Sequence, residues 1–358
     1  MTLLCRDEAD ILDEQLSFHL NAGVDFVIAT DHRSQDGTME ILRRYEREGH
    51  LRLLREEATE FSQAAWVTRM ARLAATELGA DWVINADADE FWWPRGGQPK
   101  EILSAVPRRY GVVRGFQRHF APRPGEEGHF AERMTVRITP FRTPPGAEDP
   151  FQGTIQVAHR AETSATVSPG NHDVRGRGLL ALRGWYPFEV LHFPLRTLEQ
   201  ARLKFAHRVR GVQVDPVGHH TCRAGHAIEQ GRFEDWYSQY VADDATLGRG
   251  LVDGTLTFDT RLRDALRRLA GVQELPAYPA EAFALAGDDA SRLEFTRGDT
   301  VEEAAYAHEM QPLDEWDSQL RAIRRIAALD GRLAELERGL GTRVRTRLRR
   351  RFTSASVR

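Results

Sequence analysis

Three carboxylates stand close together at the end of an apolar run. Asp87, Asp89 and Glu90 come directly after residues 82–86, whose sequence is WVINA. Negative charges at this spacing repel one another unless a cation lies among them. Oxygen ligands suit Mg²⁺ or Mn²⁺, which proteins usually hold through one or two carboxylates together with substrate phosphates. The pattern favours a divalent cation with a diphosphate, although a plain acidic turn would have the same sequence.

A second acidic turn lies upstream, in residues 31–38 (DHRSQDGT). Asp31 follows another apolar run, where its carboxylate could accept hydrogen bonds from a base or a ribose. Asp36 or Thr38 has the character of a helix N-cap. A dinucleotide-binding fold would also suit Asp31, but no Gly-x-Gly-x-x-Gly follows the first strand, and no Gly-x-x-x-x-Gly-Lys-Ser/Thr is present. These absences count against a dehydrogenase and against a phosphate-loop protein.

The elements that must position these residues alternate between strand and helix. The apolar spacing predicts helices that begin near residues 11, 36 and 62, and strands at residues 1–5, 26–30, 51–54 and 82–86. Such alternation indicates an α/β fold with a mostly parallel sheet covered on both faces. Ligands of these sheets bind beyond the carboxyl ends of the strands. The polar residues that follow the strands should therefore converge on one crevice.

The remainder of the chain is less regular. Further strands are expected at residues 110–120 and 154–159, and a helix begins at the capping-box sequence of Thr197. Three later segments look helical and charged, namely residues 228–245, 259–270 and 313–340. This organisation predicts a catalytic domain over residues 1–225, a helical C-terminal extension over 226–340, and a flexible basic tail over 341–358.

Composition places the chain among ordinary globular proteins. Of its 358 residues, 41% are hydrophobic and 28% are charged. No apolar run approaches the roughly 18 to 20 residues that span a bilayer, and no signal segment opens the sequence. Cys5 and Cys222 are too few for a disulfide framework, which fits a reducing compartment. These features predict a cytoplasmic protein.

The charge is distributed unevenly along the chain. Eight arginines and no acidic residue lie between Arg338 and Arg358, so the rest is more acidic than the net charge of -4 suggests. An acidic body with a basic tail is not typical of a nucleic-acid-binding protein. The tail is either a solvated end or a peripheral contact with the anionic inner face of a membrane. The second interpretation fails if deleting the tail leaves vesicle binding unchanged.

Three motifs of this sequence occur in a recognisable order. They are residues 6–12 (RDEADIL), 31–38 (DHRSQDGT) and 81–91 (DWVINADADEF). The ordered set resembles the family 2 glycosyltransferases, in particular their bacterial group. The resemblance is good over residues 1–93 and loose over 94–210. It implies a glycosyltransferase A-type fold, which is a nucleotide-binding α/β sandwich, here with a C-terminal helical region.

The resemblance implies nucleotide-binding roles by position. Arg6 and Glu8 belong to the opening motif, and Asp31 would contact the nucleoside. Arg69 stands where the family often places an arginine that contacts phosphate; a solvent-facing arginine is the alternative. Lys204 lies on the helix that follows Thr197, from where it could close over a diphosphate.

The same resemblance implies a set of metal ligands for Mn²⁺ or Mg²⁺. Asp87 would lie near the ribose or the metal, and Asp89 would bind the metal directly. A third ligand often comes late in this fold and is commonly a histidine. His192, after a short apolar run, is the first choice, and His172 is the competitor.

A mechanism follows from the family assignment. The metal and basic side chains would stabilise the leaving nucleoside diphosphate, and a carboxylate would take the proton of the acceptor hydroxyl in a single inverting displacement. Asp173 fits the position of this base, while Glu162, Glu132 and Asp149 remain alternatives. The expected partners are a nucleotide-sugar donor, most commonly a UDP-sugar, and a glycan acceptor.

Two other functional classes remain open at this stage. A sugar-phosphate nucleotidyltransferase also combines an α/β nucleotide fold with a metal, but it normally has a Gly-rich basic loop after the first strand, where this chain has acids. A module of the same fold that binds nucleotide or glycan without catalysis would keep the metal site and lose the base. Release of nucleoside diphosphate from a nucleotide-sugar separates the transferase from both.

Overall fold

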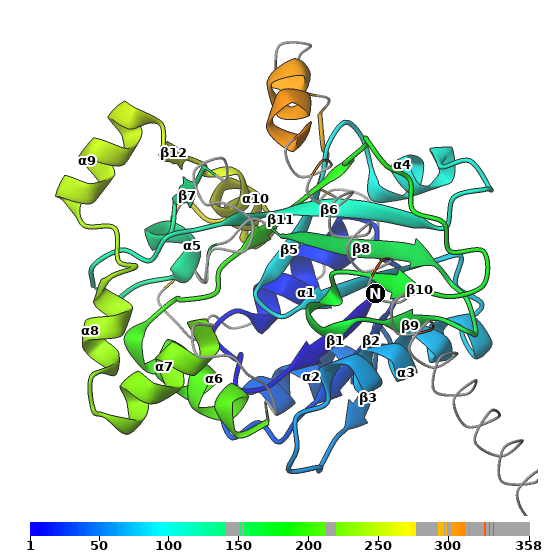
Figure 1. The fold of residues 1–358 in the computed structure, drawn as a ribbon, viewed down its shortest axis with the longest axis horizontal. Helices are drawn as coiled ribbons and strands as arrows, with labels where there is room; N and C mark the ends of the chain where they lie inside the picture. The colour runs from blue at the N-terminus through cyan, green and yellow to red at the C-terminus, as the bar shows by residue number, and fades with distance from the viewer. Residues whose placement is uncertain are drawn as a thin grey trace, which may run out of the picture. The chain divides into compact units, whose positions relative to one another are not determined.

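The computed structural model describes residues 1–125, 127–139, 151, 154–211, 220–276, 293–296, 298, 302–311, 315, 326, 329 and 332. The chain divides into two compact units, Met1–Ala305 and Tyr306–Arg358. The strands and helices described below all belong to the first unit (Figure 1). The expected basic tail, residues 341–358, and most of the helix expected at 313–340 lie outside the described residues.

The first unit alternates strands and helices in its N-terminal part and is richer in helices later. Its strands are β1 Thr2–Cys5, β2 Val27–Asp31, β3 Leu51–Arg55, β4 Trp82–Asp87, β5 Glu90–Pro94, β6 Val112–His119, β7 Val136–Ile138, β8 Ile155–Arg160, β9 Thr166–Val167, β10 Val174–Arg175, β11 Phe188–His192 and β12 Leu256–Phe258. Its helices are α1 Leu12–Asn21, α2 Thr38–Arg47, α3 Gln63–Thr76, α4 Pro99–Ala105, α5 Phe130–Arg133, α6 Leu198–Gly211, α7 His220–Glu229, α8 Phe233–Ser238, α9 Asp244–Asp253 and α10 Arg261–Ala270, with a short 3₁₀ turn, η2, at Pro169–Asn171.

Eight of the strands form one sheet in the order β3-β2-β1-β4-β8-β6-β11-β5. The first four run parallel to one another, β8 runs antiparallel to both of its neighbours, and β11 is parallel to β6. Strand β5 is the last strand of the sheet and runs antiparallel to β11. The expected α/β class with a mostly parallel sheet is therefore confirmed.

Helices cover both faces of the parallel part of the sheet because its strands are apolar on both sides. On one face α3 packs Trp66 and Met70 against Ile28 and Val83. On the other face α1 and α2 pack against the sheet in a separate cluster that includes Leu16. Figure 1 shows α2 and α3, in blue, beside β1, β2 and β3. The strands are thereby held with their carboxyl ends free to form a site.

The sheet must curl, and a two-residue connection shows why. Strand β4 ends at Asp87 and β5 begins at Glu90, yet the two strands stand four places apart in the sheet order. A link of this length spans at most about 10 Å. Four strand spacings in a flat sheet would measure about 19 Å. The second half of the sheet therefore bends back, so that the start of β5 lies beside the end of β4.

The C-terminal part departs from the expected helices at one point. The helix expected at residues 228–245 is interrupted, because Gly231 adopts a left-handed backbone (φ 67°) and ends the α7 turn. The short helix α8 follows at Phe233–Ser238, and Asp243 then caps α9, its side chain accepting from the Thr246 N–H at 2.7 Å. The domain boundary expected after residue 225 falls within α7. The helix expected at 259–270 is present as α10.

One buried histidine makes the stability of this fold depend on pH. His19, on α1, accepts from the Trp92 N–H at Nε2 (3.0 Å), so its Nδ1–H donates to the Gln15 carbonyl at 2.7 Å. Burial lowers the pKa of His19 from 6.5 to about 4. The unfolded chain takes up this proton below pH 6.5 but the folded chain does not, so the free energy of unfolding should fall by about 3 kcal/mol as the pH drops from 6.5 to 4.

Urea unfolding at a series of pH values measures this dependence. The variant His19→Gln can make both hydrogen bonds but does not titrate, so its pH dependence over the same window should be correspondingly flatter. Equal slopes for the wild type and this variant would show that another group is responsible.

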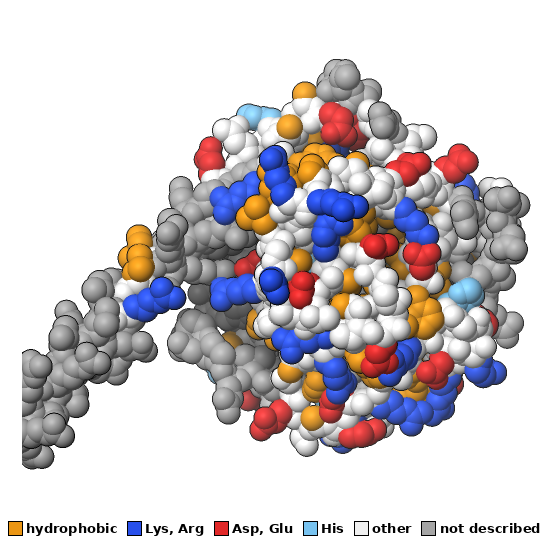
Figure 2. Space-filling model, turned by 90° about the vertical axis from the view of Figure 1, so that its right-hand side faces the viewer, with side chains coloured by type: hydrophobic (Ala, Val, Ile, Leu, Met, Phe, Trp, Pro, Cys, Tyr) orange, Lys and Arg blue, Asp and Glu red, His pale blue; other side chains and the backbone are white. Residues whose placement is uncertain are grey.

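The described helices and one face of the surface bear on contacts with membranes and nucleic acids. None of the described helices is both long enough and apolar enough to cross a bilayer. On the face shown in Figure 2, the described basic and acidic side chains are interspersed. This face therefore lacks the continuous basic surface that binding to a nucleic acid backbone requires.

Candidate active site

The carboxyl ends of three parallel strands meet at one cleft. Cys5 at the end of β1 is in register with Asp31 at the end of β2, and Leu4 with Asp87 at the end of β4. Twelve residues line the cleft: Leu4, Cys5, Arg6, Glu8, His32, Phe61, Gln63, Asp87, Ala88, Asp89, Lys204 and His207. The structure thus brings together most of the residues that the sequence analysis expected to bind nucleotide and metal.

Asp89 lies between two nitrogen-bearing side chains, Lys204 of α6 and His192 of β11. It is only 1% exposed; Lys204 donates to its Oδ2, and His192 Nε2 lies 3.5 Å from the same oxygen. The His192 and His119 rings share a hydrogen bond of 2.9 Å between their Nδ1 atoms. Burial acts to raise the pKa of Asp89, but Lys204 and His192 outweigh it and hold this pKa well below its usual value. Asp89 is therefore ionised at neutral pH.

Glu90, the third carboxyl of the acidic run, has a different role. Burial, with the nearby charges of Asp87 and Asp89, raises its pKa well above the usual value. Side-chain amides from two other strands, Gln117 (2.6 Å) and Gln156 (2.5 Å), donate to its Oε1, and the Asp87 N–H donates to its Oε2 at 3.1 Å. Glu90 thus fixes the turn that presents the two aspartates.

Asp87 is held by amide side chains from two separate elements. Gln63, the first residue of α3, donates to its Oδ1 at 3.1 Å, and Asn171, the last residue of η2, donates to the same oxygen at 3.1 Å. The Gly170 N–H in turn donates to Gln63 Oε1 at 2.9 Å. The orientation of Asp87 is therefore set before any ligand binds.

Asp31 carries a buried acceptor that no described residue satisfies. The residue is 3% exposed, and the Ser34 N–H donates to its Oδ2 at 3.3 Å. Its Oδ1 has no hydrogen-bond partner. An unpaired buried carboxylate oxygen is costly, so this atom is suited to accept from a bound ligand.

A buried arginine joins the first loop of the site to the end of β11. Arg196 is fully buried; it donates to Glu8 Oε2 at 2.5 Å, to both Asp10 oxygens at 2.6 Å and to the Phe193 carbonyl at 3.2 Å. Burial raises the pKa of Glu8 to about 7, and Arg196 and Lys204 oppose this rise. The guanidinium thus neutralises two acids and fixes Glu8 in the cleft wall.

Backbone strain is concentrated at this site. Among the described residues, three that are not glycine have a left-handed backbone: Asp7 (φ 53°), Arg33 (φ 59°) and Asn171 (φ 61°). Asp7 follows β1, Arg33 lies in the turn after β2, and Asn171 contacts Asp87. The Gln35 N–H donates to Asp7 Oδ1 at 2.6 Å, which helps to hold the first of these conformations. Such strain is typical of functional sites, where the surrounding structure enforces it.

Several expected residues lie outside the cleft lining, and Asp31 and His192 are among them. Arg69 is 45% exposed on α3 and pairs with Glu56 at 3.4 Å. Asp173 follows η2; its N–H donates to Ser168 Oγ at 2.9 Å. His172 Nδ1 lies 2.9 Å from the Ile155 carbonyl oxygen. The roles expected for these residues stay predictions.

The alternative bases are placed as follows. Glu162 accepts hydrogen bonds within its own turn, from Ser164 among others. Glu132 accepts from Arg267 of α10. Asp149 lies outside the described residues. Both described carboxylates are thus engaged in structural contacts.

The donor set suits a divalent cation only if Lys204 moves. Asp89 and His192 supply a carboxylate and an imidazole, which are ligand types that Mn²⁺ accepts. However, no three His, Cys, Asp or Glu side chains among the described residues converge as they would around a metal ion. The Asp89 oxygen that faces His192 is bound by Lys204. A metal at Asp89 would have to displace that ammonium.

The sequence analysis missed four residues that build the site. Gln63, Asn171, His119 and Arg196 contact the expected aspartates, or the glutamate and histidine beside them. The only local signals were the Pro-Gly-Asn turn that ends at Asn171, and the position of Arg196 directly after the apolar run that follows His192. Neither signal identifies a partner by itself.

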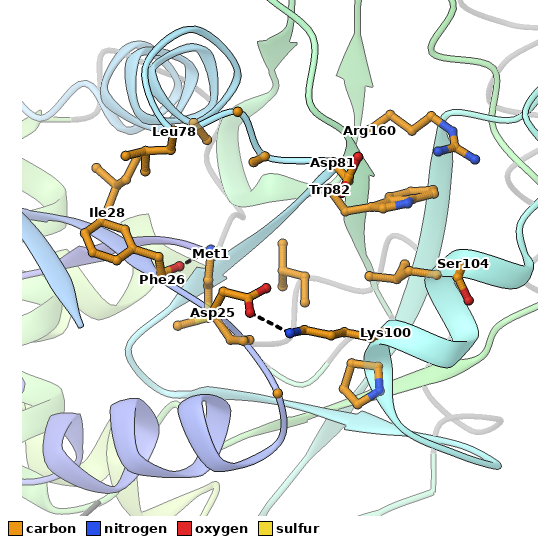
Figure 3. A pocket seen from close by; sticks show the side chains of 18 residues that line it. Met1, Asp25, Phe26, Ile28, Leu78, Asp81, Trp82, Lys100, Ser104 and Arg160 are labelled. Atoms are coloured by element: carbon orange, nitrogen blue, oxygen red, sulfur yellow. Dashed lines mark hydrogen bonds and ion pairs between the residues drawn. The ribbon is translucent and has the colours of Figure 1, made fainter. Parts of the chain in front are cut away.

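A larger cavity lies at the opposite ends of the strands. Its volume is about 710 Å³, and it is lined by residues at the starts of β1, β2 and β4 and by α4 (Figure 3). Lys100 and Asp25 form an ion pair of 2.5 Å there, and Arg160 stacks over Trp82. No site residue expected from the sequence lines this cavity. Cavity size alone therefore does not locate the chemistry.

Comparison with known families supports a glycosyltransferase. Residues 5–110 match the model of glycosyltransferase family 92. This segment covers under a third of the chain but includes Arg6, Asp31, Asp87 and Asp89. On this match the chain is a glycosyltransferase, as expected; the match does not bear specifically on the resemblance to family 2.

Matches to solved structures were also found. TarS 1-349 of S. aureus in complex with UDP is 10% identical, over 65% of this chain and 71% of that one, with a TM-score of 0.30. The same protein in complex with UDP-GlcNAc is 9% identical over 67% of this chain and 72% of that one, with a TM-score of 0.31. A mycobacterial protein is 17% identical over 60% of this chain and 74% of that one, with a TM-score of 0.28. These TM-scores are too low to bear on function. No curated protein matches the chain.

Proposed function

We propose that this chain transfers a sugar, with inversion, from a nucleotide-sugar donor to a hydroxyl group of a glycan. The observation that carries the proposal is the cleft at the carboxyl ends of β1, β2 and β4, which Asp87, Asp89 and Lys204 line and beside which Asp31 ends β2. A UDP-sugar is the first donor to test. We also propose that the chain is related to the family 2 glycosyltransferases, whose motif order it resembles. A further part of the proposal is that the basic tail contacts a membrane surface.

The charges of the cleft suit a reaction that releases a diphosphate. Negative charge develops on the leaving nucleoside diphosphate, and preorganised cations stabilise it. Lys204 lines the cleft and is held there by Asp89. A Mn²⁺ or Mg²⁺ ion held by Asp87, Asp89 and His192 would add Lewis-acid stabilisation of the same charge. For Asp89 to bind such an ion, Lys204 would have to leave it, and its ammonium would then be available to the phosphates.

Two further roles complete the proposed mechanism. The unpaired Oδ1 of Asp31 accepts a hydrogen bond from the nucleoside. Asp173 takes the proton of the acceptor hydroxyl, and its place two residues after Asn171, which contacts Asp87, supports this assignment. Arg6, Glu8 and Arg69 are proposed to support nucleotide binding; only the first two line the cleft.

Nucleotide binding tests the proposal most directly. We expect one nucleoside diphosphate among UDP, GDP and dTDP to raise the melting temperature, and to raise it further with Mn²⁺ or Mg²⁺ than with chelator. A ligand at 100 times its Kd adds about 2.7 kcal/mol to the free energy of unfolding. CMP serves as a nucleotide without a diphosphate, and for the nucleotide that binds, release of its diphosphate from the corresponding sugar donor would show turnover. If no nucleotide shifts the melting temperature, the proposal is wrong.

A further inference from the structure

The hairpin formed by β9 and β10 is held by two contacts with α3 and by one contact with Asp87 of the site. Its strands pair antiparallel through Val167 and Val174. The Val167 N–H donates to Thr68 Oγ1 of α3 at 2.9 Å, and Arg72 Nε, also of α3, donates to the Ala165 carbonyl at 2.8 Å. The third attachment is the bridge from η2 to Asp87. Figure 1 shows the hairpin beside α3.

The bridge to Asp87 is a closed set of hydrogen bonds. Asn171 and Gln63 both donate to Asp87 Oδ1, and the Gly170 N–H donates to Gln63 Oε1. Asn171 is fully buried, and its own Oδ1 has no partner. The side chain that holds Asp87 is therefore committed to this one contact among the described residues.

The backbone at Gly170 and Asn171 has the conformation that the contact with Asp87 requires. Gly170 and Asn171 both have left-handed backbones (φ 73° and 61°). A Cβ on Gly170 would collide with the His172 ring. Asparagine tolerates this conformation better than most residues that have a side chain. Two consecutive left-handed residues turn the chain sharply, so that the amide points at Asp87 and the next residues lead to Asp173.

We infer that Asn171 is a positioning residue that couples the Asp87 carboxylate to the hairpin that carries Asp173. This inference rests on the proposed function for its catalytic meaning, because Asp87 lies on the donor side and Asp173 is the proposed base. In this inference Asn171 acts through Asp87, which its amide contacts. It sets the geometry between the two sides, and a small misplacement of reacting groups lowers the rate strongly.

Hydrogen exchange of residues 163–176 tests the coupling without any ligand. Asn171→Gly keeps the left-handed backbone and removes the amide, whereas Asn171→Asp keeps the shape and places a second negative charge beside Asp87. Both variants, and Asp87→Ala, should raise exchange in the hairpin by about tenfold or more, the factor that corresponds to one lost hydrogen bond to a charged group. The double variant Asp87→Ala/Asn171→Gly should exchange no faster than the faster single variant, because all three changes break one bridge.

Arg175→Ala is the matched control, since Arg175 is exposed on the same hairpin and lies outside the bridge. It should leave exchange at the wild-type rate. The coupling is refuted if Asp87→Ala leaves the hairpin as protected as in the wild type, or if Arg175→Ala loosens it equally.

Kinetics then separates positioning from donor binding. For Asn171→Gly we expect kcat to fall about tenfold to a hundredfold while the Kd for UDP changes by less than about threefold. Equal losses in kcat and in UDP affinity would reduce Asn171 to a donor-binding role and overturn the inference. If the wild type neither binds UDP nor turns over a nucleotide-sugar, the proposed function fails, and the exchange experiment still decides the coupling.

Discussion

Replacing Asp89 with asparagine should lower the rate of sugar transfer by about 10²- to 10³-fold. This is the loss seen when one preorganised charge-stabilising group is removed from an active site. The change leaves the Lys204 ammonium, which is only 11% exposed, without its anion, and it removes the charge beside His192. The ammonium of Lys204 would then take a new position, so it would no longer be aligned for the leaving diphosphate.

The measurement is kcat for release of nucleoside diphosphate, together with the melting temperature of each variant. Asp244→Asn is the matched control, because Asp244 also pairs with a cation, Arg123, but its side chain is 95% exposed. This control should transfer at the wild-type rate. A folded Asp89→Asn protein with a kcat near that of the wild type would show that the acidic run has no part in catalysis.

Replacing Arg196 with methionine should destabilise the protein by about 3–5 kcal/mol, which is the usual result of breaking a buried ion pair from one side. Glu8 and Asp10 would lose their shared cation, and Glu8 is 8% exposed. Without the guanidinium the pKa of Glu8 should rise above its present value of about 7. A group with a raised folded-state pKa favours folding at low pH, so the destabilisation should be smaller at pH 5.5 than at pH 8.

Denaturant unfolding at both pH values measures this effect. Arg202→Met is the matched control, because Arg202 pairs with Glu199 on the exposed face of α6 and should contribute less than about 1 kcal/mol. The double variant Arg196→Met/Glu8→Gln should recover part of the lost stability at pH 8. Equal effects of the two arginine substitutions would contradict a buried structural role for Arg196.

The sequence predicted those parts of the site that follow from local periodicity. Apolar runs marked β1, β2 and β4, and the topology of a parallel sheet then required Asp31, Asp87 and Asp89 to share one edge. Lys204 was found for a similar reason, since the capping sequence at Thr197 marks the start of α6. These inferences needed only the spacing along the chain.

The rest of the site depends on contacts that local periodicity does not encode. Arg196 reaches Glu8 across 188 residues, and Asn171 reaches Asp87 across 84. A buried arginine and a surface arginine have the same local sequence pattern, so Arg196 could not be distinguished from the many exposed arginines. The nucleotide-binding role of Arg69 came from family position alone and stays a prediction; in the structure its exposed side chain pairs with Glu56.

The turn between β4 and β5 has a further consequence for how this protein can vary. Ala88 and Asp89 are the whole connection between strands four places apart in the sheet, and the same two residues line the cleft. Loops elsewhere in a protein accept insertions because length there is thermodynamically cheap. Here an extra residue would loosen the curl of the sheet and displace the acidic pair at once. The length of this turn is thus constrained together with the identity of its residues, so we expect the turn to tolerate neither insertions nor substitutions.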